Sequence, residues 1–324
     1  MKNVDLVPLS KVRGSKVIEL TINGKVVQVE PGTTVLQAAQ KLGVKIPTLC
    51  YDERLSSPGA CRLCIVEIEG MRGLPASCVT QATQGMIVYT HSEKVMEARK
   101  TILELLLANH PLDCLTCEKS GDCKLQDYCY EYGVAQTSFE GEKHVFELDD
   151  TNPYIIRDNN KCILCGKCVR ACSEIKGASV LDFSQRGFNT KVTPAFDTPL
   201  ADSDCVYCHN CVAVCPVGAL MPKELLGKGR RWEMKKEPVT CTFCEAGCNF
   251  FLCKSKRDNR VLGVLAESAG PGRPLCLKGR LGLNFAYNPD CVEKPLLKVD
   301  GEFIPVEWAE ALGLGPIVEK LKNL

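Results

Sequence analysis

The chain has 324 residues, enough for two or three domains of ordinary size. Its 40 lysines and arginines nearly balance its 39 acidic residues, so the charge does not indicate nucleic acid or an anionic membrane as a partner. Hydrophobic residues make up 45% of the chain, yet no apolar run approaches the ~20 residues that span a bilayer. Residues 1–17 lack the apolar core of a signal peptide, so we expect a soluble, cytoplasmic protein with no membrane insertion.

Residues 16–91 are expected to form a small β-grasp domain. The expected elements are a strand, a hairpin turn, a second strand, a helix and a third strand, at residues 17–22, 23–24, 25–29, 35–42 and 65–69. Thr33 or Thr34 caps the helix, and Gly43 ends it. Four cysteines lie on the loops of this domain, namely Cys50, Cys61, Cys64 and Cys78.

A longer helix is expected to begin at Ser92, with Glu93 in its first turn. Its apolar positions recur at helical spacing and are Val95, Ala98, Ile102, Leu105 and Leu106. Pro111 forbids its continuation beyond Asn109 and His110. His110 therefore stands at the end of a helix and faces the next cysteine group, which is Cys114, Cys117 and Cys123.

The rest of the chain carries a duplication and a further cysteine module. A polar connector with one or two strands leads to two runs of identical spacing, C-x2-C-x2-C-x3-C, at residues 162–172 and 205–215. The basic stretch 227–236 indicates a linker. A last cysteine module precedes a tail with an expected hairpin at residues 298–305. A weak helix follows the hairpin, and it is broken by Gly313, Gly315 and Pro316.

The 22 cysteines carry the chemistry. Disulfides are not expected without secretion, and disulfide frameworks do not repeat as C-x2-C. A lone C-x2-C pair in a cytosolic protein indicates zinc more often than iron. The duplicated run favours iron–sulfur clusters, because four ligands packed so closely fit a cubane better than one tetrahedral ion. The pattern therefore predicts an electron carrier.

In two-cluster ferredoxins, three cysteines of each run bind one cubane and the fourth crosses to the other. We therefore expect one [4Fe–4S] cluster on Cys162, Cys165, Cys168 and Cys215. The second [4Fe–4S] cluster is expected on Cys172, Cys205, Cys208 and Cys211. Pro216 follows Cys215 as the motif requires, whereas Ser173 follows Cys172.

The other cysteine groups leave alternatives open. The spacing of Cys50, Cys61, Cys64 and Cys78 is not of the plant type and allows zinc, but the β-grasp pattern around it favours [2Fe–2S]. Either His110 or Cys129 completes the group at Cys114, and the residues alone favour Cys129. The group formed by Cys241, Cys244, Cys248 and Cys276 has a zinc-ribbon alternative. The leftover thiols are expected to be small buried side chains, at Cys129, Cys253 and Cys291.

Nucleotide-binding and catalytic patterns are absent from the sequence. It contains neither G-x-G-x-x-G nor a P-loop, and no Ser/His/Asp set stands out among its four histidines. We therefore expect no catalytic residue and no flavin, NAD or molybdopterin on this chain.

In this order, the motifs resemble the N-terminal iron–sulfur region of the large peripheral-arm subunit of respiratory complex I. That region also occurs in [FeFe]-hydrogenases and NAD(P)-linked formate dehydrogenases, and the resemblance covers residues 16 to about 297. The segment His110-Pro-Leu-Asp-Cys-Leu-Thr-Cys117, with residues 121–126, is similar to the family's His/Cys3 [4Fe–4S] site. The resemblance implies that His110 is a ligand together with Cys114, Cys117 and Cys123, and that Cys129 is not. It also implies a [2Fe–2S] cluster on Cys50, Cys61, Cys64 and Cys78.

The Cys241–Cys276 module resembles the Fe4S4 domain that opens molybdopterin oxidoreductases, here in truncated form. In that family a lysine placed like Lys278 lies between the cubane and the pterin, so Lys278 is a candidate cofactor-adjacent residue. Such proteins continue for hundreds of residues, and Cys291 stands where they often carry arginine. No hydrogenase active-site cysteine motif follows Cys215.

The expected fold class is an α+β multidomain protein. Its domains are a β-grasp [2Fe–2S] ferredoxin domain, a helical His/Cys3 cluster segment, a connector with a two-cluster ferredoxin-like domain, a linker, a small Fe4S4 domain and a tail. Their expected bounds are 16–91, 92–135, 136–222, 223–236, 237–290 and 291–324.

With one [2Fe–2S] and four [4Fe–4S] clusters, the chain is expected to be an electron-transfer subunit of a soluble flavin- and NAD(P)-dependent oxidoreductase. The expected setting is an electron-bifurcating transhydrogenase, hydrogenase or formate dehydrogenase. Its expected partners are a flavin/NAD(H)-binding subunit, a further redox or catalytic subunit and ferredoxin. One alternative is the amino-terminal electron-input part of a molybdenum or tungsten formate dehydrogenase. A zinc-binding structural module is a more remote alternative.

Overall fold

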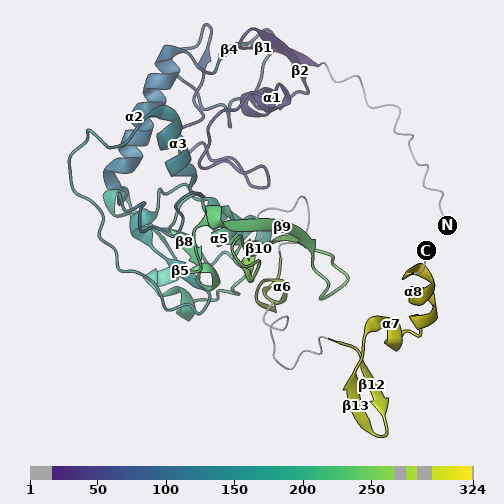
Figure 1. The fold of residues 1–324 in the computed structure, drawn as a ribbon. Helices are drawn as coiled ribbons and strands as arrows, with labels where there is room; N and C mark the ends of the chain where they lie inside the picture. Colours follow the sequence, from purple (N-terminus) through teal and green to yellow (C-terminus); the bar gives the residue numbers. More distant parts are fainter. Residues whose placement is uncertain (1–16, 266–274, 283–293, 323–324) are drawn as a thin grey trace, which may run out of the picture. The chain divides into compact units, whose positions relative to one another are not determined.

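The computed structural model describes residues 17–265, 275–282 and 294–322 (Figure 1). The chain divides into two compact units, Met1–Cys276 and Leu277–Leu324. The strands are β1 (Ile18–Ile22), β2 (Lys25–Val29), β3 (Glu67–Ile68), β4 (Ile87–Tyr89), β5 (Ile155–Arg157), β6 (Asp182–Ser184), β7 (Lys191–Thr193), β8 (Leu220–Pro222), β9 (Met234–Thr240), β10 (Asn249–Ser255), β11 (Val261–Leu265), β12 (Leu296–Val299) and β13 (Glu302–Pro305). The α-helices are α1 (Val35–Lys41), α2 (Glu93–Asn109), α3 (Lys124–Tyr132), α4 (Lys167–Arg170), α5 (Asn210–Val214), α6 (Leu277–Leu281), α7 (Trp308–Ala311) and α8 (Gly315–Lys322).

The first module is a four-stranded mixed sheet in the order β2-β1-β4-β3. β1 and β2 are antiparallel across Asn23 and Gly24, whose φ values of 49° and 78° form the left-handed turn that a tight hairpin needs. β4 adds to β1 in parallel. Thr34 and Gln37 form a capping box at the start of α1, as the sequence predicts for one of the two threonines.

The core of this module is built by alternate residues of the sheet and one face of α1. The buried members include Leu20, Ile22, Val29, Val35, Leu36, Ala38, Ala39 and Val88. The strand expected at residues 65–69 is shorter than predicted, because only Glu67–Ile68 pair regularly and Ile65 makes an isolated bridge to Ala76.

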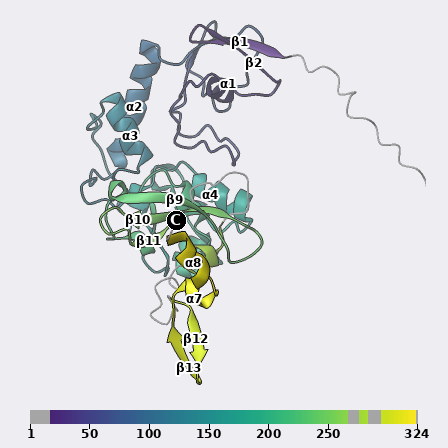
Figure 2. The same ribbon diagram turned by 45° about the vertical axis from the view of Figure 1, so that its right-hand side comes forward.

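Helix α2 begins after Ser92 and ends at Asn109, both as predicted, and His110 is its C-cap residue. The buried face of α2 differs from the set of apolar positions noted in the sequence, of which only Val95 is fully buried. The buried positions are Val95, Arg99, Leu103 and Leu107, whereas Leu105 is 53% exposed. Helices α2 and α3 lie side by side (Figure 1, Figure 2) and share a core with loop residues of the first module.

Arg99 is fully buried and ties α2 to two other segments. Its Nη1 donates to the Tyr132 hydroxyl at 2.9 Å, and its Nη2 donates to the Ile65 carbonyl at 2.7 Å. The arginine therefore joins the first module, α2 and α3 through groups that would otherwise be buried without partners.

The duplicated cysteine runs adopt the same backbone twice. Leu164 and Tyr207 occupy equivalent positions and share a φ of 53°, and Gly166 and His209 follow with φ values of 66° and 59°. These left-handed residues turn the chain around each cysteine loop before the short helices α4 and α5 begin. β5 and β8 pair antiparallel at the two ends of this module, and β6 pairs with β7 inside it.

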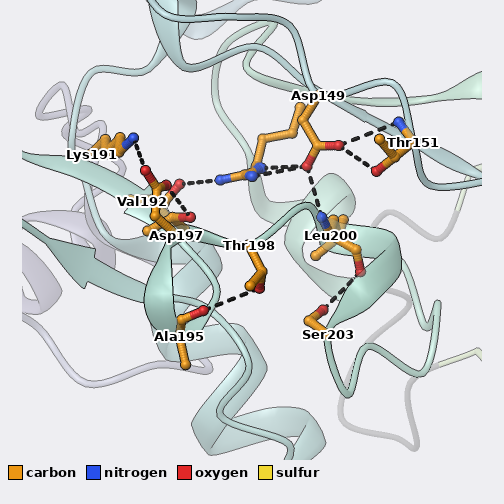
Figure 3. A network of polar contacts seen from close by, with 11 residues as sticks. Asp149, Thr151, Lys191, Val192, Ala195, Asp197, Thr198, Leu200 and Ser203 are labelled. Atoms are coloured by element: carbon orange, nitrogen blue, oxygen red, sulfur yellow. Dashed lines mark hydrogen bonds and ion pairs between the residues drawn. The ribbon is translucent and has the colours of Figure 1, made fainter.

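A buried ion pair fastens the connector to the duplicated module (Figure 3). Arg157 donates from Nε and Nη2 to Asp149 Oδ2, at 3.0 and 2.9 Å, and from Nη1 to the Val192 carbonyl. Asp149 also accepts hydrogen bonds from Thr151 and from the backbone N–H of Leu200. Burial raises the pKa of Asp149, but these hydrogen bonds and the Arg157 charge outweigh it, so the pKa lies below its ordinary value.

The basic segment 227–236, expected as part of a linker, is folded. It contains a 3-10 turn at Arg231–Glu233 and enters β9, which lies in the three-stranded sheet β11-β10-β9. Arg230 donates to the carbonyls of Leu115 and Cys117. The Trp232 ring lies against Gly121, where an added Cβ would stand 2.3 Å from the ring. The segment therefore packs on the stretch that follows His110.

The second unit contains the predicted hairpin, formed by β12 and β13 in antiparallel pairing. Gly313 separates α7 from α8, as expected, but Pro316 lies in the first turn of α8 instead of breaking a helix. No helix among the described residues combines the length and apolar character needed to cross a membrane. Cys291 lies outside the described residues.

Replacing Arg99 with Met should lower the free energy of unfolding by about 3 kcal/mol, because the Ile65 carbonyl and the Tyr132 hydroxyl lose their buried donor. Chemical denaturation of the full chain measures the difference. Arg72→Met, at an exposed loop residue, is the control and should cost less than about 0.5 kcal/mol. Equal losses in the two variants would contradict a structural role for Arg99.

Replacing Asp149 with Asn should destabilise the chain by about 3 kcal/mol, because Arg157 stays buried without its counter-charge. Asp149 has a lowered folded pKa, so its contribution is complete above the unfolded value of about 3.9 and is lost only as pH falls through the folded pKa. The difference in thermal midpoint between wild type and variant should therefore be the same at pH 8 and pH 5. A difference that shrinks over this interval, or that equals the difference for exposed Asp204→Asn, would refute the assignment.

Candidate metal centres

Four thiols gather on the loops of the β-grasp module. Cys50, Cys64 and Cys78 are buried, and Cys61 is half-buried. The thiols of Cys61 and Cys78 donate to Cys50 and lower its pKa, and the thiol of Cys78 lowers the pKa of Cys64 although burial raises it. The donors have raised pKa values for the same reason. Hydrogen bonds therefore link the four predicted ligands of the [2Fe–2S] site in the order Cys61, Cys50, Cys78 and Cys64.

The two duplicated runs line two cavities. The first cavity has an empty volume of about 430 Å³, and its thiols come from Cys162, Cys165, Cys168 and Cys215. The second has an empty volume of about 370 Å³, and its thiols come from Cys172, Cys205, Cys208 and Cys211. Each cavity thus combines three thiols of one run with the last thiol of the other.

Burial controls the ionisation of these thiols. Desolvation raises the pKa of Cys162 to about 12 and that of Cys165 to about 11, and it raises the pKa of Cys168 well above its ordinary value. Neighbouring thiols add to the effect, since two thiolates repel each other. A cationic iron cluster would stabilise all four thiolates in such an apolar cavity.

Polar side chains also line each cavity. Arg157 lines the first cavity, and its Nε, Nη1 and Nη2 all donate to Asp149 or to the Val192 carbonyl. Asn210 lines the second, and its Nδ2 is buried with no hydrogen-bond partner among the described residues. Neither residue stands out in the sequence as a site residue. The only signal for Asn210 is its position between two ligands of the run, at the place that Lys167 occupies in the other copy.

His110 lies at the C-terminal end of α2 and lines a cavity with an empty volume of about 880 Å³ together with Cys114, Cys123 and Cys129. Its Nδ1 lies 2.8 Å from the Pro111 carbonyl, which fixes the proton on Nδ1. Its Nε2 therefore keeps its lone pair, and this atom is buried with no hydrogen-bond partner in the described part of the chain. Burial lowers the pKa of His110, so the ring is neutral and its Nε2 is suited to bind a metal.

The structure places the competing ligand Cys129 and the predicted ligand Cys117 differently with respect to His110. Cys129 lines the His110 cavity, and burial raises its pKa to about 11. Cys117 is not among the lining residues of that cavity. Its Sγ points at Gly218, where an added Cβ would stand 3.0 Å away, although its charge still influences Cys114 and Cys123.

The last cysteine group is more open. Cys241 directly follows β9 and Cys248 directly precedes β10, and the Cys241 N–H donates to the Cys248 carbonyl at 2.7 Å. Cys241 is buried, whereas Cys244 and Cys276 are exposed. Lys278 lies in α6, and Cys253 is buried in β10. Cys241, Cys244 and Cys248 thus lie on the connection between β9 and β10, whose two ends are joined by this hydrogen bond.

These donor sets fit iron–sulfur clusters. Thiolates and a neutral imidazole are the ligands that such clusters use. Within the described ranges, no three His, Cys, Asp or Glu side chains are grouped so as to hold a single metal ion. A cubane does not need that grouping, because each of its irons binds a different ligand, so the ligands surround a group of atoms instead of meeting at one.

Three family models match successive parts of the chain. The 2Fe-2S iron-sulfur cluster binding domain matches residues 15–93. The NADH-ubiquinone oxidoreductase-G iron-sulfur binding region matches residues 99–138. The ferredoxin-like domain of NADH-quinone oxidoreductase subunit 3 matches residues 152–221. The first three candidate regions therefore coincide with known iron–sulfur domains.

Known relatives come from respiratory and hydrogenase complexes. A G-type subunit of the NADH-quinone oxidoreductase of Rhizobium meliloti is 42% identical over 91% of this chain and 34% of its own length. NADP-reducing hydrogenase subunit HndD of Solidesulfovibrio fructosivorans is 44% identical over 89% of this chain and 49% of its own length. The chain therefore spans about a third to a half of the length of these curated relatives.

A solved structure also shares the fold. A chain of an NAD+-reducing [NiFe]-hydrogenase in its H2-reduced state matches with a TM-score of 0.60 and 36% identity, over 64% of this chain and 87% of that chain. Together with the three domain matches, this likeness confirms the resemblance that the cysteine motifs indicate. The chain belongs to the family of iron–sulfur proteins that includes the G-type subunits of NADH-quinone oxidoreductase and the corresponding subunits of NAD(P)-linked hydrogenases.

Proposed function

We propose that this chain is an iron–sulfur electron-transfer subunit of a multi-subunit NAD(P)-linked oxidoreductase. The observation that carries the proposal is the pair of cavities in the duplicated module, each lined by three thiols of one run and one of the other. A site for a single tetrahedral ion does not require ligands from both runs, whereas the two clusters of a ferredoxin do. We assign one [2Fe–2S] and four [4Fe–4S] clusters to the five ligand groups.

When bound, the clusters supply reversible one-electron chemistry. The side chains of this chain hold them, exclude water and adjust the local charge. The Asn210 amide offers an N–H donor to the second cavity, whereas the charge of Arg157 beside the first cavity is balanced by Asp149. The Asn210 donor favours the more negative, reduced state and should raise the reduction potential of its site.

His110 is the ligand we assign to the cluster beside α2. Its buried Nε2 lone pair faces no donor in the described part of the chain, and its Nδ1 proton is held by the adjacent carbonyl. Cys129 lines the same cavity and is the competing ligand. Because imidazole is neutral and thiolate is not, His110 should give this site a higher reduction potential than four thiolates would.

The partners we propose follow from the relatives. Their names describe subunits of NADH-quinone oxidoreductase and NADP-reducing hydrogenase, which transfer electrons to or from a nicotinamide nucleotide. We therefore propose a flavin/NAD(H)-binding partner subunit and a further redox or catalytic subunit or ferredoxin, in an electron-bifurcating complex. The Cys241–Cys276 group is proposed as the last cluster, with Lys278 beside it.

Anaerobically purified chain should contain about eighteen iron atoms, the number that one [2Fe–2S] and four [4Fe–4S] clusters hold. It should be brown and bleach with dithionite. Metal analysis and visible spectroscopy measure both properties. A colourless chain with several equivalents of zinc and little iron would refute the proposal and support a zinc-binding structural module.

Variants at the cluster beside α2 should separate the competing ligands. His110→Ala should remove about four irons and one [4Fe–4S] electron paramagnetic resonance (EPR) signal, because the cluster loses a ligand. His110→Cys should keep the cluster and lower its midpoint potential, since a thiolate adds negative charge. Redox titration monitored by EPR measures these changes.

Cys129→Ser is the matched control and should leave both the iron content and the potential of this site unchanged. Cys117→Ser should behave like His110→Ala. Loss of the cluster in Cys129→Ser with its retention in His110→Ala would show that Cys129 is the ligand and that the assignment of His110 is wrong.

A further inference from the structure

Arg170 connects two of the proposed cluster sites. It is the last residue of α4, between two ligands of the first cysteine run. Its Nη2 donates to the Cys50 carbonyl at 2.7 Å and to the Cys165 carbonyl at 3.3 Å, and its Nη1 donates to the Ser56 carbonyl. Cys50 belongs to the β-grasp site, whereas Cys165 belongs to the first site of the duplicated module. One guanidinium therefore bonds the backbone of a ligand from each site.

The surroundings of Arg170 hold the same two segments together. Leu55 is buried against Ala171 and Val214, with Ile175 beside them. The carboxylate of Glu174 accepts hydrogen bonds from the N–H of Ser56 at 2.8 Å and from its hydroxyl at 2.5 Å. These contacts form a packed interface instead of a chance meeting of two loops.

An ion pair also spans this interface. The Nζ of Lys167 lies 3.5 Å from Asp52, which is already paired with Arg54. Lys167 and Arg170, two charged side chains of the first cysteine run, therefore both reach the loop of the β-grasp site.

We propose that Arg170 is a positioning residue that fixes the separation of the β-grasp site from the Cys162/Cys165/Cys168/Cys215 site and raises the reduction potentials of both. The inference rests on the proposed function, because both sites must hold their clusters. Electron tunnelling slows exponentially with distance, so a residue that holds both ligand backbones controls the exchange between them. The guanidinium is planar and always charged, which lets one side chain bind three carbonyls and act on both sites.

Two variants separate these two effects. Arg170→Lys keeps the positive charge but cannot bind three carbonyls at once, so it should leave both potentials near their wild-type values and weaken the magnetic interaction between the sites. Arg170→Met removes the charge as well, so it should weaken the interaction and shift both potentials downward. The full cluster-loaded chain is used for EPR-monitored redox titration. The spin relaxation of the reduced [2Fe–2S] signal measures its interaction with the neighbouring reduced cubane.

Arg186→Met is the matched control, because Arg186 is an exposed arginine of the same module. It should change neither property, and the site beside α2 should be unchanged in every variant. Selective loss of the two joined clusters from Arg170→Met, with the others retained, would also support the proposal. Loaded Arg170 variants with wild-type relaxation and potentials would overturn it. Zinc in place of iron in the wild-type chain would instead overturn the proposed function.

Discussion

The organising constraint is the cost of placing several thiolates together in an apolar interior. Burial raises the pKa of Cys162, Cys165 and Cys168, and each thiolate also repels its neighbours, so the folded chain needs a cation at their centre. The backbone is shaped around this need. Left-handed residues at Leu164 and Tyr207 wrap each loop so that its sulfurs line a common cavity, although neither is a glycine. Asn210 then supplies an N–H donor for the sulfurs around the second cavity, which carry the negative charge of a loaded site.

Local patterns in the sequence predict much of the fold, because the relevant forces act within a few residues. The Asn23-Gly24 turn, the Thr34 cap and the end of α2 before Pro111 all follow from neighbouring backbone geometry. The choice of which face of α2 is buried does not follow from the local sequence. Leu105, Leu106 and Leu107 are consecutive, so apolar residues point in several directions, and only the partner segments select Leu107. Buried Arg99 is invisible to a pattern of apolar residues, since its burial depends on the Tyr132 hydroxyl and a distant carbonyl.

The candidate sites also combine features that the local sequence predicts with features that depend on packing between distant segments. The crossed grouping of the duplicated cysteines is encoded in their spacing, because identical runs fold into identical loops that face each other. Spacing alone could not choose between His110 and Cys129, since that choice depends on how α3 packs beside α2. Nothing in the sequence distinguishes Arg170 from the other basic residues. Its contact with Cys50 exists only because two modules distant in the chain share an interface.

The pairing of β5 with β8 has a consequence for how such proteins are assembled over evolution. β5 precedes the first cysteine run and β8 follows the second, and the two strands lie side by side in antiparallel register. The chain therefore enters and leaves the duplicated module at neighbouring positions. Inserting or deleting such a module leaves the flanking chain ends close enough to rejoin with little rearrangement. The paired strands β5 and β8 thus mark a boundary at which one cluster-binding module can be exchanged for another without disturbing the neighbouring modules.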